Sequence, residues 1–122
     1  RLDTLDVNAN TALTDLRCYS NLLTELDVSA NTALTRLWCF NNALTTLDMS
    51  ANTALTDLRV QSNQFTATAL NALFGTLHSN PGAKTVYIYN NPKNNGAGTS
   101  DCTPSIAESR YWTVDTAITA NQ

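Results

Sequence analysis

The residues that could carry out a reaction are few in this chain of 122 residues. Asp15 and Asp57 are separated by Arg36, midway between them in the sequence. Paired carboxylates catalyse glycoside hydrolysis, but a guanidinium between them favours the ionised form of both, which does not suit a general acid. The single histidine, His78, is expected at a helix end, away from these residues, so no nucleophile has a base within reach. We therefore expect an ion-pair ladder rather than an enzyme active site.

The three cysteines allow a disulfide, a zinc site or simple core packing. An odd count argues against a complete disulfide framework. Cys18 and Cys39 take inward positions on consecutive predicted strands, where stacked side chains rarely reach the dihedral angle of a disulfide. Two thiols without a nearby histidine are too few for zinc, which takes about four ligands. We predict free thiols, and find no support for a pairing with Cys102.

A column of carboxylates recurs elsewhere in the chain, at Asp6, Asp27 and Asp48. Stacked carboxylates could bind Ca²⁺, but one acid in each repeat supplies too few oxygen ligands. We favour local hydrogen bonds, beside Ser29 and Ser50 for the last two of these residues. The sequence therefore predicts no metal and no other cofactor.

Hydrophobic residues recur with a regular period over the first half of the chain. The spacing alternates between 11 and 10 residues, so two half-repeats form a unit of 21, anchored by Leu2, Leu13, Leu23, Leu34, Leu44, Leu55 and Phe65. One half reads Leu-Thr-x-Leu-x-Cys-x-x-Asn-x-Leu, and the other reads Leu-x-x-Leu-Asp-Val-Ser-x-Asn-Thr-Ala. The Leu-x-Cys triplet has the period of a short strand. The asparagines are expected to form two ladders that bind backbone groups at turns, Asn21, Asn42, Asn63 and Asn10, Asn31, Asn52.

These repeats resemble the leucine-rich-repeat family, with the motif LxxLxLxxNxL, and are most similar to the nested variety of 21 residues in surface and secreted proteins of Bacteroides-like bacteria. Residues 44–54 carry the resemblance clearly, and it extends over residues 2–65. It implies an α/β leucine-rich-repeat solenoid with a right-handed superhelix and short parallel strands, located extracellularly or at the bacterial cell surface. Because Arg1 falls inside a repeat, we expect the sequence to begin within a longer protein.

The second part of the chain, residues 66–122, is predicted to complete the same domain after repeats in residues 1–65. A helix is expected over 67–78, capped by Thr66 or Thr68. Residues 84–91 restore the strand pattern and are predicted to form the last strand. A loop over 94–100 and a helix over 104–110, capped by Thr103, would follow, and Trp112 and Val114 would cover the open end.

Outward-facing positions of the strands supply the candidate binding site. Residues 21 apart should stack, because parallel strands lie about 4.8 Å apart. The resulting columns are Arg17, Trp38, Arg59, Tyr87 and Tyr19, Phe40, Gln61, Tyr89, beside the ladder that contains Arg36. Exposed aromatic and arginine side chains are typical of binding surfaces, although mutual packing explains them equally well.

The composition of the chain limits the classes of partner that it is expected to bind. The net charge is −3 with seven Lys and Arg, which disfavours nucleic acid, and no apolar run is long enough to span a membrane. We expect a protein or peptide ligand. The alternatives are a carbohydrate ligand on the same face, or a structural spacer without a ligand.

Overall fold

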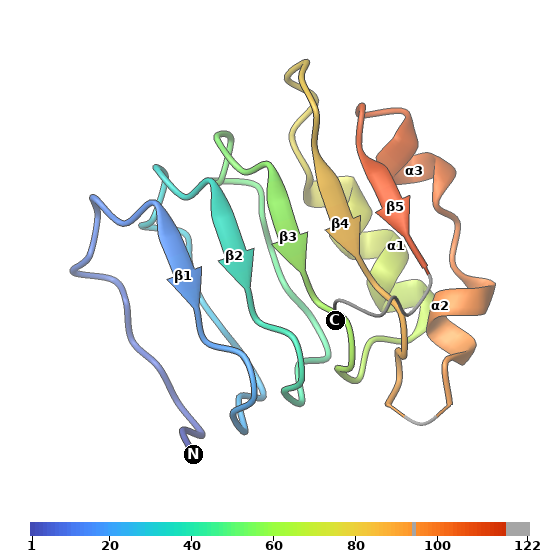
Figure 1. Ribbon diagram of the computed structural model, residues 1–122, viewed down its shortest axis with the longest axis horizontal. Coiled ribbons are helices and arrows are strands. Elements are labelled where there is room, and N and C mark those ends of the chain that lie inside the picture. Colours follow the sequence, from blue (N-terminus) through green and yellow to red (C-terminus); the bar gives the residue numbers. More distant parts are fainter. Residues whose placement is uncertain (94, 117–122) are drawn as a thin grey trace.

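Among the residues that the structure describes, five short parallel strands run side by side along one side of a stack of coils (Figure 1). This computed structural model describes residues 1–93 and 95–116; residue 94 and residues 117–122, which belong to the predicted loop and cap, lie outside that description. Each strand pairs with the next one along the chain. The strands are β1 (Asp15–Arg17), β2 (Arg36–Trp38), β3 (Asp57–Arg59), β4 (Thr85–Tyr87) and β5 (Thr113–Asp115).

The register confirms that residues one repeat apart stack in space. Leu16 pairs with Leu37, and Leu37 with Leu58, each a step of 21 residues. The next steps, from Leu58 to Val86 and from Val86 to Val114, are each 28 residues long. The longer coils have room for helices, whereas the first coils return along extended segments.

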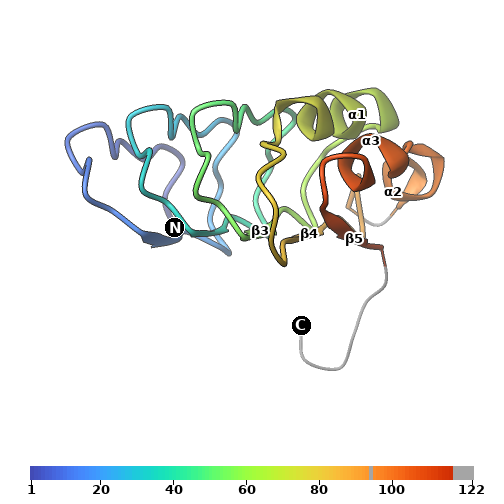
Figure 2. The same cartoon turned by 90° about the horizontal axis from the view of Figure 1, so that it is seen from above.

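In the described part of the chain, three helices lie on the side of the coils away from the strands, in the C-terminal half (Figure 2). They are α1 (Ala67–Thr76), α2 (Ala97–Asp101) and α3 (Ser105–Glu108). The predicted cap of α1 is confirmed, since the Thr66 hydroxyl accepts from the Ala69 backbone N–H at 3.2 Å. The apolar face of α1 is buried by Leu70, Leu73 and Phe74, and the helix ends two residues before the predicted end at 78.

Two details of the C-terminal part differ from the sequence-based prediction. Helix α2 lies in the segment predicted as a loop, because Gly98 lets it approach the main chain after β3 closely. A Cβ at Gly98 would lie 2.3 Å from the carbonyl oxygen of Phe65. The glycines that suggested a loop are thus needed for packing. The helix predicted over 104–110 is confined to α3, with turns at residues 109–111.

The prediction that the strand over residues 84–91 is the last one is wrong. Val114 does not simply cover the open end but lies in β5, paired with Val86 of β4. Trp112, which is 2% exposed, packs in the core beside this fifth strand. The chain therefore ends its described part with a further complete coil.

Buried leucines and asparagines hold the coils together. Leu37 and Leu58 are fully buried. Asn42 donates from Nδ2 to the carbonyl oxygens of Cys18 and Cys39, both at 3.1 Å, and accepts from the Leu23 N–H at 3.0 Å. The second ladder works similarly, and Asn91 extends the first one into the C-terminal coils. One coil alone could not bury these groups, so the stack is the stable unit.

Candidate functional site

Cationic and aromatic side chains alternate in one stack across β1 to β4, on the outer face of the sheet. The guanidinium carbon of Arg17 lies 4.3 Å from the centre of the Trp38 ring, and that of Arg59 lies 4.1 Å from it. These arginines come from the strands on either side of Trp38, so the indole is held between two cations. Arg59 also lies 4.5 Å from the centre of the Tyr87 ring. The predicted column of Arg17, Trp38, Arg59 and Tyr87 therefore packs side chain against side chain, and each of its members remains at least partly exposed.

Two copies of the tripeptide Asp-Leu-Arg hold the outer arginines in place. Arg17 donates from Nε and Nη2 to the two carboxylate oxygens of Asp15, each at 3.2 Å. Arg59 donates to Asp57 in the same way, at 3.1 and 3.4 Å. Residues two apart on a strand leave the same face, so each strand forms this contact locally. We call each such pair an Asp–Arg fork.

Arg36 joins the two forks. Its Nη1 lies 3.2 Å from a carboxylate oxygen of Asp15, and its Nε lies 3.7 Å from one of Asp57. The predicted ladder is thus confirmed. The contacts within each strand were not predicted, although the repeated Asp-Leu-Arg was a signal for them. The pKa of the Asp15 carboxyl lies below its ordinary value of 3.8, chiefly because of the hydrogen bond from Arg17. A general acid needs a raised pKa, so this shift is in the opposite direction.

The third outward column divides into an accessible half and a buried half. The rings of Tyr19 and Phe40 are stacked, with centres 4.5 Å apart and planes at 4° to one another. Gln61 and Tyr89 are only 2% and 7% exposed, so the expectation that their side chains are exposed on this face is wrong. Burial raises the pKa of the Tyr89 hydroxyl. This column lies just after the strands, next to residues with a left-handed backbone, where alternation along a strand no longer determines exposure.

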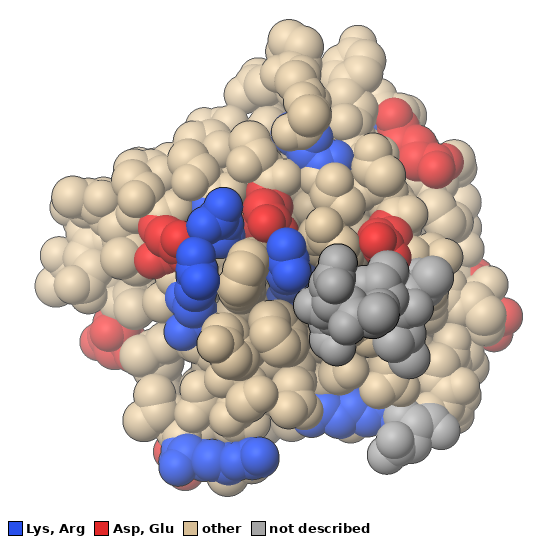
Figure 3. Space-filling view, in the orientation of Figure 1, with Lys and Arg blue, Asp and Glu red and all other residues tan. Residues whose placement is uncertain are grey.

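The remaining predicted binding residues lie together on the outer face. Tyr19 is exposed, and the side chains of Arg17 and Arg36 are 46% and 42% exposed. The other four are half-buried: Trp38, Phe40, Arg59 and Tyr87. Figure 3 shows basic and acidic side chains intermingled on this face, with uncharged surface between them. Seven of the nine predicted residues therefore form one accessible surface, which we call the arginine–aromatic face.

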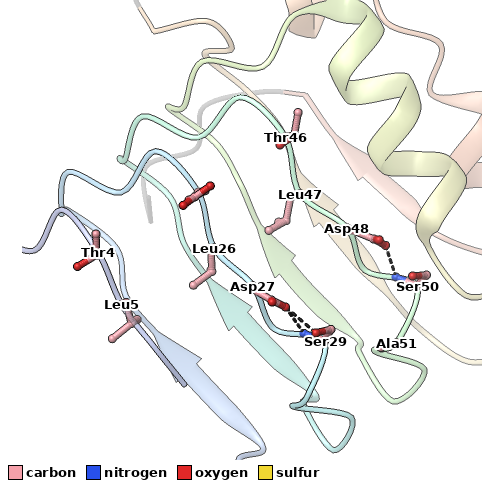
Figure 4. A pocket seen from close by; sticks show the side chains of 11 residues that line it. Thr4, Leu5, Leu26, Asp27, Ser29, Thr46, Leu47, Asp48, Ser50 and Ala51 are labelled. Carbon is pink, nitrogen blue, oxygen red and sulfur yellow. Dashed lines mark hydrogen bonds between the residues drawn. The ribbon is translucent and has the colours of Figure 1, made fainter. Parts of the chain in front are cut away.

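Asp27 and Asp48 of the carboxylate column line a groove of about 630 Å³ on the opposite side of the first three coils (Figure 4). Asp27 accepts hydrogen bonds from the N–H and hydroxyl of Ser29, and Asp48 accepts from the N–H of Ser50. These bonds lower the pKa of both carboxyls. The predicted local role is confirmed for these two residues. Within residues 1–93 and 95–116, no cluster of His, Cys, Asp and Glu could hold a metal ion.

The two core thiols are buried, and His78 contacts backbone groups. Cys18 and Cys39 are buried and unpaired, as predicted, and burial raises the pKa of Cys18 to about 11. His78 is half-buried just beyond the end of α1, and its Nε2 lies 2.7 Å from the Leu55 carbonyl oxygen. Its Nδ1 accepts from the Asn80 N–H at 3.2 Å. Both ring nitrogens are thereby engaged with backbone.

Stacked coils, asparagine ladders and a parallel sheet of one strand per coil define the fold as an α/β leucine-rich-repeat solenoid. Among solved structures, the chain is similar to the functional domain of InlJ from Listeria monocytogenes, which is described as including a cysteine ladder. The two are 25% identical with a TM-score of 0.61, and the match covers 94% of this chain and 23% of that one. None of the known family models matches the chain, and no curated protein matches it. None of the helices in the described part is long and apolar enough to cross a bilayer.

Proposed function

We propose that this chain is a non-enzymatic recognition module that binds a protein or peptide through its arginine–aromatic face. The observation that carries the proposal is the stack of Arg17, Trp38, Arg59 and Tyr87, which lies across four neighbouring strands and remains partly accessible. Aromatic and arginine side chains dominate the energy of many interfaces, and solenoids commonly bind along such a surface.

A peptide fits this face better than a neutral sugar does. Sugar rings stack on open aromatic faces, but guanidinium groups cover both faces of Trp38. Tyr19 and Phe40 cover one another, which leaves each with at most one open face. Ordered side chains also lose little entropy when they bind a ligand. A structural spacer without a ligand does not need such a surface. The alternative outcome of the test is therefore that the chain binds no ligand and acts as a spacer.

Further parts of the proposal concern the setting of the module. We place it in a bacterial protein at the cell surface or outside the cell, and among repeats of the nested 21-residue variety. The repeats at residues 2–65 and the likeness to InlJ of Listeria monocytogenes support this setting. Antibody labelling of intact producing cells should detect the module, whereas labelling only after lysis would contradict a surface location.

The binding proposal is tested with peptides selected from a random display library on the immobilised chain. Selected peptides should bind at least about tenfold more weakly to Trp38→Ala and to Tyr87→Ala. Tyr111→Ala serves as the matched control, because Tyr111 is exposed but lies off this face, and it should change binding less than about threefold. Each variant is first checked for native circular dichroism. Failure to select any peptide, or binding unaffected by both substitutions on the face, would overturn the proposal.

A further inference from the structure

Trp38 offers its rim rather than its faces to a ligand. Arg17 and Arg59 lie over the ring from the two neighbouring strands, and the residue is half-buried. The rim of an aromatic ring is the positive end of its quadrupole, whereas the faces are negative. Because guanidinium groups cover the negative faces, the accessible parts of Arg17, Trp38 and Arg59 are electropositive, next to the carboxylates of the two Asp–Arg forks.

The arginines around Trp38 retain donors that no described residue uses. Each guanidinium has five N–H groups. Arg17 and Arg59 use Nε and Nη2 for their own Asp–Arg forks, and Arg36 uses Nη1 for Asp15. Within residues 1–93 and 95–116, Nη1 of the first two and Nη2 of Arg36 make no hydrogen bond. These terminal nitrogens are suited to bind oxygen acceptors.

Charge is distributed unevenly along the face. Over β1 to β3, three arginines accompany two aspartates, although the whole chain has a net charge of −3. At the other end, Asp115 of β5 lies in register with Tyr87. The basic side chains accordingly gather over the first strands in Figure 3. A negatively charged ligand is drawn to β1–β3 rather than to β5.

From these observations, and resting on the proposed function, we infer that the ligand is an acidic peptide that places carboxylates on Arg17 and Arg59, on the two sides of Trp38. The guanidinium carbons of the two arginines lie 4.3 and 4.1 Å from the centre of the same ring, so they are at most about 8.4 Å apart. Alternate side chains of an extended peptide leave one face about 6.7 Å apart, and glutamate side chains are long enough to span the difference. The Asp–Arg forks position both guanidinium groups beforehand, which reduces the entropy lost on binding.

The class of ligand is tested with a labelled peptide in which glutamate alternates with threonine, and with a matched peptide of glutamine and threonine. Fluorescence anisotropy should show at least about tenfold weaker binding of the neutral peptide. Binding of the acidic peptide should weaken as salt is raised from low to physiological concentration. In a ¹⁵N-correlated NMR spectrum, the acidic peptide should shift the indole signal of Trp38 and leave that of the buried Trp112 in place, which also shows that the protein remains folded.

Variants locate the contact. Arg17→Gln and Arg59→Gln should each weaken binding of the acidic peptide at least about fivefold, in line with the loss of a charge-assisted hydrogen bond. Arg1→Gln removes the same charge away from the face and should change binding less than about twofold. Equal binding of the two peptides, or unchanged binding by both variants on the face, would overturn the inference. Tighter binding of a sulfated oligosaccharide than of the acidic peptide would also overturn it, in favour of an anionic glycan.

This result can be separated from that of the proposed function. If peptides selected from the library are neutral and lose affinity with Trp38→Ala, the recognition module stands and the acidic ligand is wrong. If no peptide of either kind depends on Trp38 or Tyr87, the recognition surface itself is wrong.

Discussion

Asn63 donates from its side-chain Nδ2 to the backbone carbonyl oxygen of Cys39 at 3.1 Å, although the two residues are 24 positions apart. The same amide donates to the Val60 carbonyl at 3.0 Å and accepts from the Leu44 N–H at 2.9 Å. One fully buried side chain therefore satisfies backbone groups in two successive coils.

The first prediction follows from this contact. Asn63→Ala leaves several buried backbone groups without partners and should lower the free energy of unfolding by about 3 kcal/mol, measured by urea denaturation. Asn8→Ala is the control, because Asn8 is exposed, and it should change stability by less than about 0.5 kcal/mol. A loss below about 1 kcal/mol in Asn63→Ala would show that the ladder does not hold the coils together.

A second prediction concerns the contact between Arg59 and Trp38. A double-mutant cycle with Arg59→Met and Trp38→Leu should give a coupling free energy of about 0.5–1 kcal/mol in urea denaturation, because each substitution removes one partner of a cation–π pair. The parallel cycle of Arg59→Met with Tyr111→Leu joins residues of separate parts of the surface and should give no coupling. Equal coupling free energies in the two cycles would mean that stacking of Arg59 on Trp38 does not contribute to stability.

Thiol reactivity supplies a third prediction. Burial raises the pKa of Cys18 to about 11 and that of Cys39 well above its ordinary value, so both thiolates are scarce near neutral pH. Cys102 is only partly buried. An aromatic disulfide reagent should label one thiol in the native protein and three after denaturation. Cys102→Ser should abolish the native reaction, and fast native labelling of that variant would contradict the predicted burial of the other two.

The pH dependence of stability is the fourth prediction. Hydrogen bonds from Ser29 and Ser50 lower the pKa of Asp27 and Asp48 from 3.8 in the folded state. Such carboxylates stabilise the fold above their unfolded pKa, and this contribution disappears as the pH falls through the folded pKa. The thermal midpoint should therefore fall below about pH 4, and it should fall less in the double variant Asp27→Asn, Asp48→Asn. Parallel curves for the two proteins would refute this source of acid sensitivity.

Much of the candidate site was predictable because a repeated coil converts sequence spacing into spatial proximity. A step of 21 residues brings Arg17 next to Trp38, and Trp38 next to Arg59. The same step predicted the ion-pair ladder through Arg36. The position of Tyr87 was also predicted, although its coil is longer, because its strand repeats the pattern of apolar residues and asparagine.

Other features depend on contacts that no period describes. The two final steps of 28 residues follow from the insertion of α1 and of the α2–α3 segment, whose packing depends on close approaches such as that of Gly98 to Phe65. Sequence composition marked α2 as a loop, since glycine is a poor helix former in isolation. All five strands are three residues long, and the fifth was missed because Val114 is not followed by the second apolar residue and the asparagine that mark the other four in the sequence.

By itself, the sequence determined the coil, the register and the columns of side chains, because these follow from local periodicity repeated at a constant step. Only the tertiary structure decided which members of a column are accessible and which surfaces of a ring remain open. Gln61 and Tyr89 are buried, and Trp38 has both faces covered. The physical reason is that alternation along a strand sets the direction in which a side chain leaves the sheet, whereas its exposure depends on whatever packs over it.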